Sequence, residues 1–437
     1  MGVSMAPWAV CSRPARALVA GSRAMRSKVI STRKGNPAGP GPLPLPAHSR
    51  CLPLPPYLPK SPVFWLLVAC VLAQFYYWFY YFGPFARRPA EAPADAPGPH
   101  ADDEPVSIVV CARNELENLR RLLPLLLKQD YPAGFEVVLI DDRSYDETQD
   151  YAQQLGQYYA GRFRLVTIKS TPDGFAPKKY ALTLGIKAAT HPRLLFTDAD
   201  CIPATNQWLR LMQRGFGAPG APAGLVLGFS GYAEGPGLLN RLIRYETLLT
   251  AAQYLSFAWR GRPYMGVGRN LGYTWATFAA AKGFASHIRR LSGDDDLLVQ
   301  DAVAQGVRAA VVADAPAHTL SEPAATWGAW WTQKRRHLSA GSRYRLADRA
   351  RIGTFVMANL LPYALTAGLV FSPQYWVPLA VVWALRTFAL AYVYGILGRR
   401  LEQKLPSAWL PLLDGLYFAQ YVAISFSLLF KRSLRWK

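Results

Sequence analysis

The chain has 437 residues, and its 49 Lys and Arg residues against 28 Asp and Glu give a formal net charge of +21. Hydrophobic residues make up 51% and charged residues 18%, below the roughly 25% that is usual in soluble domains. These values exclude a disordered protein, a collagen and a small disulfide-rich scaffold, and they leave a membrane protein or a nucleic-acid binder.

The N-terminal segment 1–60 carries nine Lys or Arg residues and no acid, and Pro and Gly crowd its second half. A composition of this kind cannot bury a core, so we expect a disordered basic tail. A lipid-binding arm, or an extension from an upstream start codon with Met25 as a later start, are the alternatives. The segment 61–83 is uncharged and supplies the ~20 apolar residues of a membrane-spanning helix. A linker rich in Pro, Ala and Asp follows over 84–104.

From residue 105 to 325, short β-rich apolar runs alternate with stretches of helical spacing. The expected strands are 106–111, 135–140, 163–168, 194–197 and 225–229. Continuous apolar strands separated by helices indicate an α/β fold with a mainly parallel sheet that is covered on both faces. Ligands of such sheets bind at the carboxyl ends of the strands, so the polar residues there are candidates for a site.

Two carboxylates follow the fourth expected strand. Asp198 and Asp200 are two residues apart in the sequence and are expected to point the same way. Without a cation between them they would repel each other, and hard oxygen ligands of this kind suit Mg²⁺ or Mn²⁺. A role in helix capping or in a loop is the alternative for this pair.

Further polar residues flank the second and third expected strands. Asp141 and Asp142 end the second strand, and Lys178 and Lys179 begin a helix after the third. The aspartates fit either a turn with a helix cap or hydrogen bonds to a ribose or base. The lysines fit either solvated positions or a diphosphate site, where the free backbone N–H groups of a helix start would add to their charge.

Three more apolar runs predict about three membrane helices across 351–431. The second run contains Arg386 and the third contains Asp414. Because a charge inside a span is costly, we expect these two residues to pair or to contact an anionic, lipid-like substrate, unless Asp414 lies near the interface and Arg386 snorkels. The basic segment 398–407 favours the cytoplasmic side, but an even number of crossings would place the basic tail 432–437 outside. This conflict leaves open an interfacial or re-entrant role for one of the runs.

Seven segments then occur in a recognisable order: VSIVVCARNELENL, LIDDRSYDET, APKKYALTLGI, LFTDADCIP, MGVGRNLGYT, SGDDDLL and QKRRH. In order and approximate spacing they resemble the family 2 inverting glycosyltransferases with the GT-A fold, in particular the membrane-bound bacterial type. The resemblance covers about 106–337. It implies that 105–325 forms a GT-A domain that binds a nucleotide sugar.

The resemblance also implies a role for each matching residue. The residues that match nucleotide-sugar contacts are Arg113, Glu115, Asp142, Lys178 and Asp198. Asp200 matches the more direct metal ligand, with Asp198 as the second. Arg269 and Asn270 fall in the segment that shapes the acceptor side. Arg143 stands where the family usually has Gly, which leaves the conformation of that turn open.

The acidic run Asp294–Asp296 occupies the place of the family's catalytic-base motif, and we take Asp295 as the base, with Asp294 as the second choice. The chemistry requires such a group, because an acceptor hydroxyl is a poor nucleophile until a carboxylate accepts its proton. Crowded acids raise one another's pKa, which favours proton transfer. A helix start that favours negative charge is the alternative.

Gln333 and Arg336 match the family's QxxRW motif, and His337 replaces its Trp. Region 326–350 is therefore expected to contain an interfacial helix whose Trp side chains lie at the membrane surface. An arginine near the active site can neutralise the leaving diphosphate. A helix that only anchors the protein to the membrane is the alternative.

Together these features predict a membrane-bound inverting glycosyltransferase that uses a nucleotide-diphosphate sugar, UDP-linked by expectation, with Mg²⁺ or Mn²⁺. The expected acceptor is a hydroxyl of a lipid-linked or membrane-proximal saccharide of the cell envelope. We expect a multi-pass protein of the bacterial inner (cytoplasmic) membrane with its catalytic domain in the cytoplasm, and no nucleic-acid partner. A processive polysaccharide synthase and a catalytically inactive membrane scaffold are the alternatives.

Overall fold

The computed structural model describes residues 59–89, 104–217 and 222–430. Nearly all of the predicted basic tail, most of the predicted linker and the C-terminal tail therefore lie outside the described residues. The chain from Pro59 onward forms one compact unit.

A seven-stranded sheet forms the centre of the catalytic region, with strand order β3-β2-β1-β4-β8-β6-β9. Its strands are β1 (Val106–Ala112), β2 (Phe135–Asp142), β3 (Phe163–Ile168), β4 (Arg193–Asp198), β6 (Leu225–Gly228), β8 (Leu271–Thr274) and β9 (Ala309–Val312). Only β8 runs antiparallel to its neighbours, β4 and β6, and the other pairs in this sheet are parallel. The predicted α/β fold with a mainly parallel sheet is therefore confirmed.

Helices cover the sheet and explain why its central strands are continuously apolar. They are α3 (Leu116–Leu127), α4 (Thr148–Tyr158), α5 (Pro177–Ala188), α6 (Trp208–Arg214), α8 (Trp275–Ala280) and α9 (Asp296–Ala304). Every residue of β2 is buried, as expected for a strand between two helical layers. On α5, a Cβ added to Gly185 would lie 2.3 Å from the Ile140 side chain, so this helix packs very close to the sheet.

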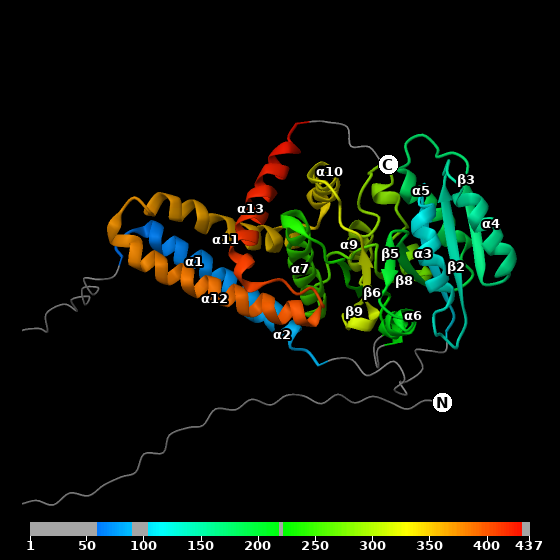
Figure 1. The fold of residues 1–437 in the computed structure, drawn as a ribbon, viewed down its shortest axis with the longest axis horizontal. Coiled ribbons are helices and arrows are strands. Elements are labelled where there is room, and N and C mark those ends of the chain that lie inside the picture. The colour runs from blue at the N-terminus through cyan, green and yellow to red at the C-terminus, as the bar shows by residue number, and fades with distance from the viewer. Residues whose placement is uncertain (1–58, 90–103, 218–221, 431–437) are drawn as a thin grey trace, which may run out of the picture. The chain divides into compact units, whose positions relative to one another are not determined.

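A second, three-stranded sheet lies beside the first and consists of β5 (Cys201–Pro203), β10 (Thr319–Ser321) and β7 (Ser230–Tyr232). Behind it runs the long helix α7 (Gly237–Trp259), most of whose side chains are buried. Helix α7 contacts β7 and β9 on one side and the membrane helices on the other, so it joins the two regions (Figure 1).

Three helices of the described residues are long and apolar enough to cross a membrane. The first comprises α1 (Pro62–Tyr76), a π-helical stretch (Tyr77–Phe82) and α2 (Gly83–Ala86), and the others are α11 (Leu346–Leu369) and α12 (Trp376–Arg400). They lie side by side in Figure 1, and side chains such as Leu385 and Phe388 of α12 are exposed on the outside of the bundle.

After residue 345, two of the three predicted runs, α11 and α12, are long and apolar enough to cross a membrane, which agrees with the alternative that one run does not span. The third apolar run forms α13 (Leu410–Ser427), which is not among the helices that qualify as spans. Instead α13 packs against α7 and against α10 (Trp327–Leu338), outside the three-helix bundle (Figure 1). Its outer side chains, Val422 and Phe426, are exposed.

A buried ion pair joins α12 to α13. The Arg386 guanidinium lies 2.6 Å from the Asp414 carboxylate, and both side chains are almost fully buried. The hydroxyls of Tyr245 and Tyr363 donate to the same carboxylate at 2.7 and 2.6 Å, and Arg386 donates to Gln74 at 2.8 Å. The two charges pair, which was one of the two predicted possibilities, so the other, with an interfacial Asp414 and a snorkelling Arg386, is wrong. Five helices meet at this one polar cluster.

Candidate active site

The carboxyl ends of three strands meet at one edge of the sheet. In the parallel register Ala112 lies beside Asp141, and Cys111 lies beside Asp198. A cavity of about 1080 Å³ reaches from Asp198 at this edge to the membrane helix α11 and to α13. It is larger than a typical pocket for one small ligand, so it has room for two substrates.

The end of β4 brings the paired carboxylates to the cavity. Asp198 is the last residue of this strand, and Asp200 follows two residues later as an exposed side chain that lines the cavity. The Asp200 Oδ1 atom lies 3.6 Å from the Cys201 thiol. Both aspartates therefore present oxygen atoms to the same space, as their spacing predicts.

Lys178, in the first turn of α5, bridges two carboxylates from distant parts of the chain. Its ammonium lies 3.1 Å from Asp198 and 2.9 Å from Asp294. Burial alone would lower the pKa of Lys178, but the two carboxylates raise it well above its usual value. The lysine is therefore charged and holds the DxD segment against the acidic run that precedes α9.

The three aspartates at the start of α9 have different surroundings. Burial would raise the pKa of Asp294, but its ion pair with Lys178 lowers it. Asp295 has no such pair. Burial and the neighbouring Asp294 charge raise its pKa, although the backbone N–H groups of Gly268 and Asp296 donate to its carboxylate at 3.0 and 2.8 Å. Asp295 thus presents a fixed carboxylate to the cavity with a raised proton affinity.

Asp296 belongs to the acidic run but has a different partner. Burial and the charge of Asp295 raise the pKa of Asp296 to about 7, and the Tyr344 hydroxyl donates to its carboxylate. Asp295 lines the cavity, has a raised pKa and accepts hydrogen bonds from backbone N–H groups. Its two neighbours differ, because Asp294 pairs with a lysine and Asp296 accepts from a tyrosine hydroxyl. The geometry therefore favours Asp295 over its neighbours as a proton acceptor.

The described residues contain no cluster of three or more His, Cys, Asp or Glu side chains that would hold a metal ion unaided. Asp198 and Asp200 nevertheless suit Mg²⁺ or Mn²⁺, because such ions take one or two carboxylates and complete their coordination with water and substrate phosphate. Both side chains line a cavity that is large enough for that phosphate. The donor set therefore fits a metal that binds together with its substrate.

The residues predicted to contact the nucleoside lie at the same edge but outside the cavity lining. Arg113 and Glu115 occupy the loop between β1 and α3, where the Glu115 carboxylate accepts a hydrogen bond from Asn118 at 2.6 Å. Asp142 is buried at the end of β2 and pairs with Arg143 at 2.8 Å. Arg143 has a φ of 59°, the left-handed conformation that Gly adopts easily, and this answers the question about the turn.

The two residues predicted for the acceptor side separate in the structure. Arg269 lines the cavity, and its guanidinium lies 4.4 Å from the centre of the Tyr232 ring. Asn270 is fully buried and does not line the cavity. Its amide donates to the carbonyls of Phe229 and Ala317 and accepts from Trp208, so it joins three segments of the chain.

Helix α10 carries the matched QxxR residues into the same cavity. Gln333, Arg336 and His337 all line it. Lys334, on the same helix, pairs with Glu246 of α7 at 3.0 Å, and both side chains are largely buried. The predicted residues of α10 therefore lie together with the DxD carboxylates and Asp295.

Lys179 differs from both of its expected roles. It is buried, and its ammonium donates to the carbonyls of His287 and Ser292 at 2.9 and 2.8 Å. Burial lowers its pKa to about 8. The lysine thus fixes the loop that precedes Asp294, instead of lying in solvent or beside a diphosphate.

Sequence reasoning also missed two contacts and one wall of the site. The Gly268 N–H group and the Tyr344 hydroxyl hold the acidic run. The family resemblance placed Gly268 only in the acceptor-side segment with Arg269 and Asn270, and Tyr344 does not stand out by type or spacing. The wall opposite the carboxylates comes from α11 and α13 and is partly apolar. The apolar and aromatic residues of that wall are Ile352, Val356, Tyr417, Tyr421 and Ile424. Their hydrophobicity is also what a packed helix requires, so the sequence held no separate signal for them.

Comparison with known proteins identifies related chains. The family model for glycosyl transferase family 2 matches residues 107–276, and that for glycosyl transferase family group 2 matches residues 196–426. Glycosyltransferase AglE of Haloferax volcanii is 30% identical over 105 residues, 24% of this chain, and the match spans only a third of that relative's length.

Two solved structures illustrate the fold likeness. The mannosyltransferase PcManGT of Pyrobaculum calidifontis, solved with GDP-Man and Mn²⁺, has a TM-score of 0.51 at 17% identity over 85% of this chain and 99% of its own. S. aureus TarS, solved with UDP-GlcNAc, has a TM-score of 0.38 at 17% identity over 74% of this chain and 90% of its own. The first likeness supports the GT-A fold, and a family model covers more than half of the chain, from residue 196 to residue 426. The chain therefore belongs to glycosyltransferase family 2.

Proposed function

We propose that this glycosyltransferase moves a sugar from a nucleotide-diphosphate sugar, UDP-linked in our view, to a hydroxyl group of a lipid-linked or membrane-proximal acceptor, with inversion at the anomeric carbon. The observation that carries the proposal is the division of charge in the cavity. Lys178 forms ion pairs with Asp198 and Asp294, while Asp295, which forms no ion pair with it, has a raised pKa.

Asp198 and Asp200 would hold a Mg²⁺ or Mn²⁺ ion, with Asp200 as the more direct ligand. Bound there, the ion would supply positive charge for the diphosphate and for the charge that grows as it leaves. Lys178 and Arg336 add fixed positive charge in the same cavity. The solved relative with GDP-Man and Mn²⁺ supports this assignment in general terms, without deciding between the two ions.

Asp295 acts as the general base in a single displacement. The acceptor oxygen forms its bond to the anomeric carbon while the bond from that carbon to the diphosphate oxygen breaks. The hydroxyl proton passes to Asp295, and the electron pair leaves with the diphosphate. Because attack occurs on the face opposite the leaving group, the configuration inverts, and no covalent enzyme intermediate is needed. The two backbone N–H donors of Asp295 keep its carboxylate aimed at the cavity.

The acceptor would approach from the membrane. The wall formed by Ile352 and Val356 belongs to α11, one of the three helices that can cross a bilayer. A substrate with an apolar part can therefore reach the cavity without leaving the lipid. The presence of Asp295 favours a hydroxyl acceptor over a phosphate acceptor. A hydroxyl needs a base to accept its proton, whereas a phosphate oxygen is already ionised.

A topology follows from three crossings. The catalytic region, the basic segment 398–407 and the C-terminal end then share one side of the membrane. The excess of Lys and Arg on that segment favours the cytoplasm. We accordingly place the protein in the cell membrane as a multi-pass protein with its catalytic region in the cytoplasm.

The test is a screen of nucleotide sugars for turnover by the full-length protein, repeated with D295N, D200N and a chelator. Both variants are expected to lose transfer by about 10²–10⁴-fold while they remain folded, because one loses the base and the other a metal ligand. Excess chelator should have a similar effect. D301N, on the same helix as the base but not in the cavity lining, serves as the matched control and should keep wild-type activity.

Full activity of D295N would refute the assignment of the base and move attention to Asp294. The absence of turnover by wild-type protein with every donor would favour an inactive scaffold. A long polymer as product would favour a processive synthase.

A further inference from the structure

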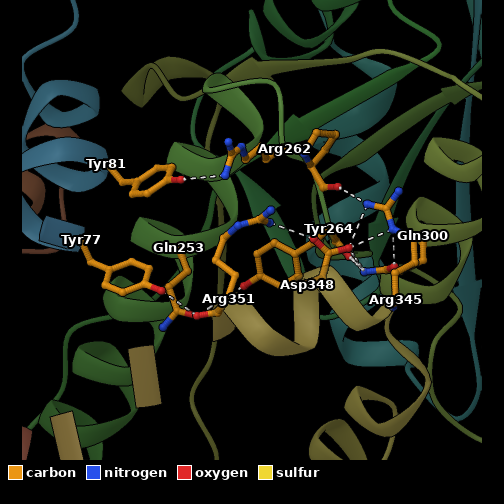
Figure 2. A network of polar contacts seen from close by, with 10 residues as sticks. Tyr77, Tyr81, Gln253, Arg262, Tyr264, Gln300, Arg345, Asp348 and Arg351 are labelled. Carbon is orange, nitrogen blue, oxygen red and sulfur yellow. Dashed lines mark hydrogen bonds and ion pairs between the residues drawn. The ribbon is translucent and has the colours of Figure 1, made fainter. Parts of the chain in front are cut away.

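A buried aspartate at the start of the membrane helix α11 lies at the centre of a polar network (Figure 2). Asp348 is 3% exposed and pairs with Arg345 and Arg351 at 2.9 Å each. The cavity lining does not include Asp348, so direct contact with a substrate in the cavity does not account for it. Its partners lead instead toward the catalytic run.

Gln300 connects this aspartate to α9. Its amide nitrogen donates to Asp348 at 3.2 Å and to the carbonyl of Tyr264 at 2.8 Å. Its amide oxygen accepts from the backbone N–H and the side chain of Arg345, both at 3.1 Å. Every polar atom of this buried side chain is thus engaged, and Figure 2 shows Gln300 between Tyr264 and the Arg345–Asp348 pair.

The two elements that Gln300 ties together are the same two that hold the proposed base. The Asp295 carboxylate accepts one hydrogen bond from the Asp296 N–H at the start of α9 and another from the Gly268 N–H. Gly268 follows Tyr264 by four residues in the same loop. If α9 and this loop move apart, the two donors no longer converge on Asp295. The Gln300 side chain, one helical turn further along α9, holds the helix to the same loop through the Tyr264 carbonyl.

The network also extends into the membrane segment. The Tyr77 hydroxyl donates to the carbonyl of Arg351 at 2.9 Å, and the Arg262 guanidinium donates to Tyr81 at 3.4 Å. Both tyrosines belong to the π-helical stretch of the first membrane helix. The network around Asp348 and Gln300 is therefore in contact with two of the three helices that can cross a membrane, the first one and α11 (Figure 2).

We propose that Asp348 is a positioning residue, which acts through Gln300 to hold α9 and the 264–268 loop in the register that aims Asp295 at the acceptor. This inference rests on the proposed function, since it assumes that Asp295 is the base. It assigns a role in the reaction to a residue of a membrane helix that touches no substrate.

The test compares D348N with wild-type protein in lipid nanodiscs. D348N keeps the shape of the side chain but weakens both ion pairs. We expect kcat to fall by about 10- to 100-fold, since small misplacements of a catalytic group have effects of this size. The KM for the donor should stay within about twofold, because the donor residues do not contact the network. D348E, which restores the charge, should recover part of kcat.

D314N is the matched control. Asp314 also forms an ion pair at 2.9 Å with an arginine of a membrane helix, Arg400 of α12, but it is not part of the polar network drawn in Figure 2. We expect its kcat to remain within about twofold of wild type. Equal losses in D348N and D314N, or a loss confined to the melting temperature, would overturn the proposal.

A double-mutant cycle with Q300A examines the route. Because both changes break the same link, their effects on kcat should be far less than multiplicative. A product of the two single effects would overturn the route through Gln300.

Amide hydrogen exchange provides a readout that needs no substrate. D348N should speed exchange at residues 264–268 and in the first turn of α9, but not in β1 or β2. Unchanged exchange in D348N contradicts the inference, even if the wild-type protein turns over no donor. If exchange in D348N is faster but the wild-type protein is inactive, only the proposed function is contradicted.

Discussion

At the scale of residues, the site separates three adjacent aspartates by their partners. Lys178 pairs with Asp294, backbone N–H groups hold Asp295, and Tyr344 donates to Asp296. The result is one ionised carboxylate with a low pKa beside one carboxylate with a raised pKa. A pair of acids with divergent pKa values is a common feature of sites that transfer protons.

This division predicts the pH dependence of transfer. Burial and the Asp294 charge raise the pKa of Asp295. The two backbone N–H groups that donate to Asp295 and the charge of Lys178 lower this pKa, but by less than it is raised. Since the base must be ionised, kcat should fall as the pH drops through this raised pKa, which lies above the ~4 of an ordinary aspartate. D294N removes the neighbouring negative charge and should move the acid limb to lower pH. The measurement is a profile of kcat against pH, with D301N as control. A shift of D294N to higher pH would contradict the assignment.

The sequence predicted much of this site because the chemistry demands acids at strand ends and at a helix start. Asp198, Asp200, Asp295 and Lys178 do line one cavity. Residue type and position alone do not distinguish Lys178 from Lys179, because their roles depend on which one points toward the sheet edge, and only the family resemblance selects Lys178. It also gives no sign of Gly268 as a donor, since that contact comes from its backbone and not from a side chain.

At the scale of elements, the Arg386–Asp414 cluster holds the membrane helices to α7 and α13. Its charges are 1% and 2% exposed, and the tyrosine and glutamine partners come from three further helices. Removal of one charge would leave the other buried without its partner, which is the costly outcome for a buried pair.

D414N or R386L should therefore lower the free energy of unfolding by about 3–5 kcal/mol. The double variant R386L/D414L should lose less than the sum of the single variants, because no buried charge is left alone. The measurement is thermal or denaturant unfolding in detergent, with L385A as control, since Leu385 faces outward on the same helix. A loss no greater than that of L385A would show that the pair contributes little.

Elements differ in how well their sequence specifies them. The strands were predictable, because β1 and β2 are apolar throughout and are buried on both faces. The helix α13 was not, because its apolar residues serve contacts with α7 and α10 as much as they would serve contact with lipid. Its polar residues, Asp414 and Gln420, lower its hydropathy below that of the three spans, and only the packing reveals the difference.

At the scale of the whole molecule, the number of crossings decides which parts of the chain share a side of the membrane, and our proposal has three. An odd number places α13 and the C-terminal end with the catalytic region. The segment 398–407 then lies on that side too, which satisfies the positive-inside rule for this part of the chain.

This arrangement predicts the outcome of protease mapping. A protease site inserted at Gln374, between α11 and α12, should lie on the side opposite to one inserted at Ser407, after α12. Both positions are exposed. In inside-out vesicles a soluble protease should cleave only at Ser407, and it should cleave at Gln374 only after detergent is added. Cleavage of both sites in sealed vesicles would contradict the three-crossing topology.

The sequence defined the order of regions along the chain but not how they meet. It predicted a catalytic region between membrane segments, and the structure confirms the fold of that region. It gave no indication that α11 and α13 would line the catalytic cavity, because that contact joins residues such as Ile352 and Ile424 to Asp198, far away in the chain. Distances of this kind follow from tertiary packing, which local patterns do not encode.

The position of α13 beside the three-helix bundle has a mechanical consequence. In the proposed membrane arrangement, the bundle holds the enzyme at one point, and the exposed Val422 and Phe426 of α13 hold it at another. A single anchor would let the catalytic half swivel, whereas two attachments fix its tilt. The carboxylate end of the cavity then keeps a constant height above the headgroups. Acceptors would then be selected by the distance of their hydroxyl from the membrane surface. A hydroxyl close to the headgroups could contact the carboxylates, whereas one at the far end of a long glycan could not.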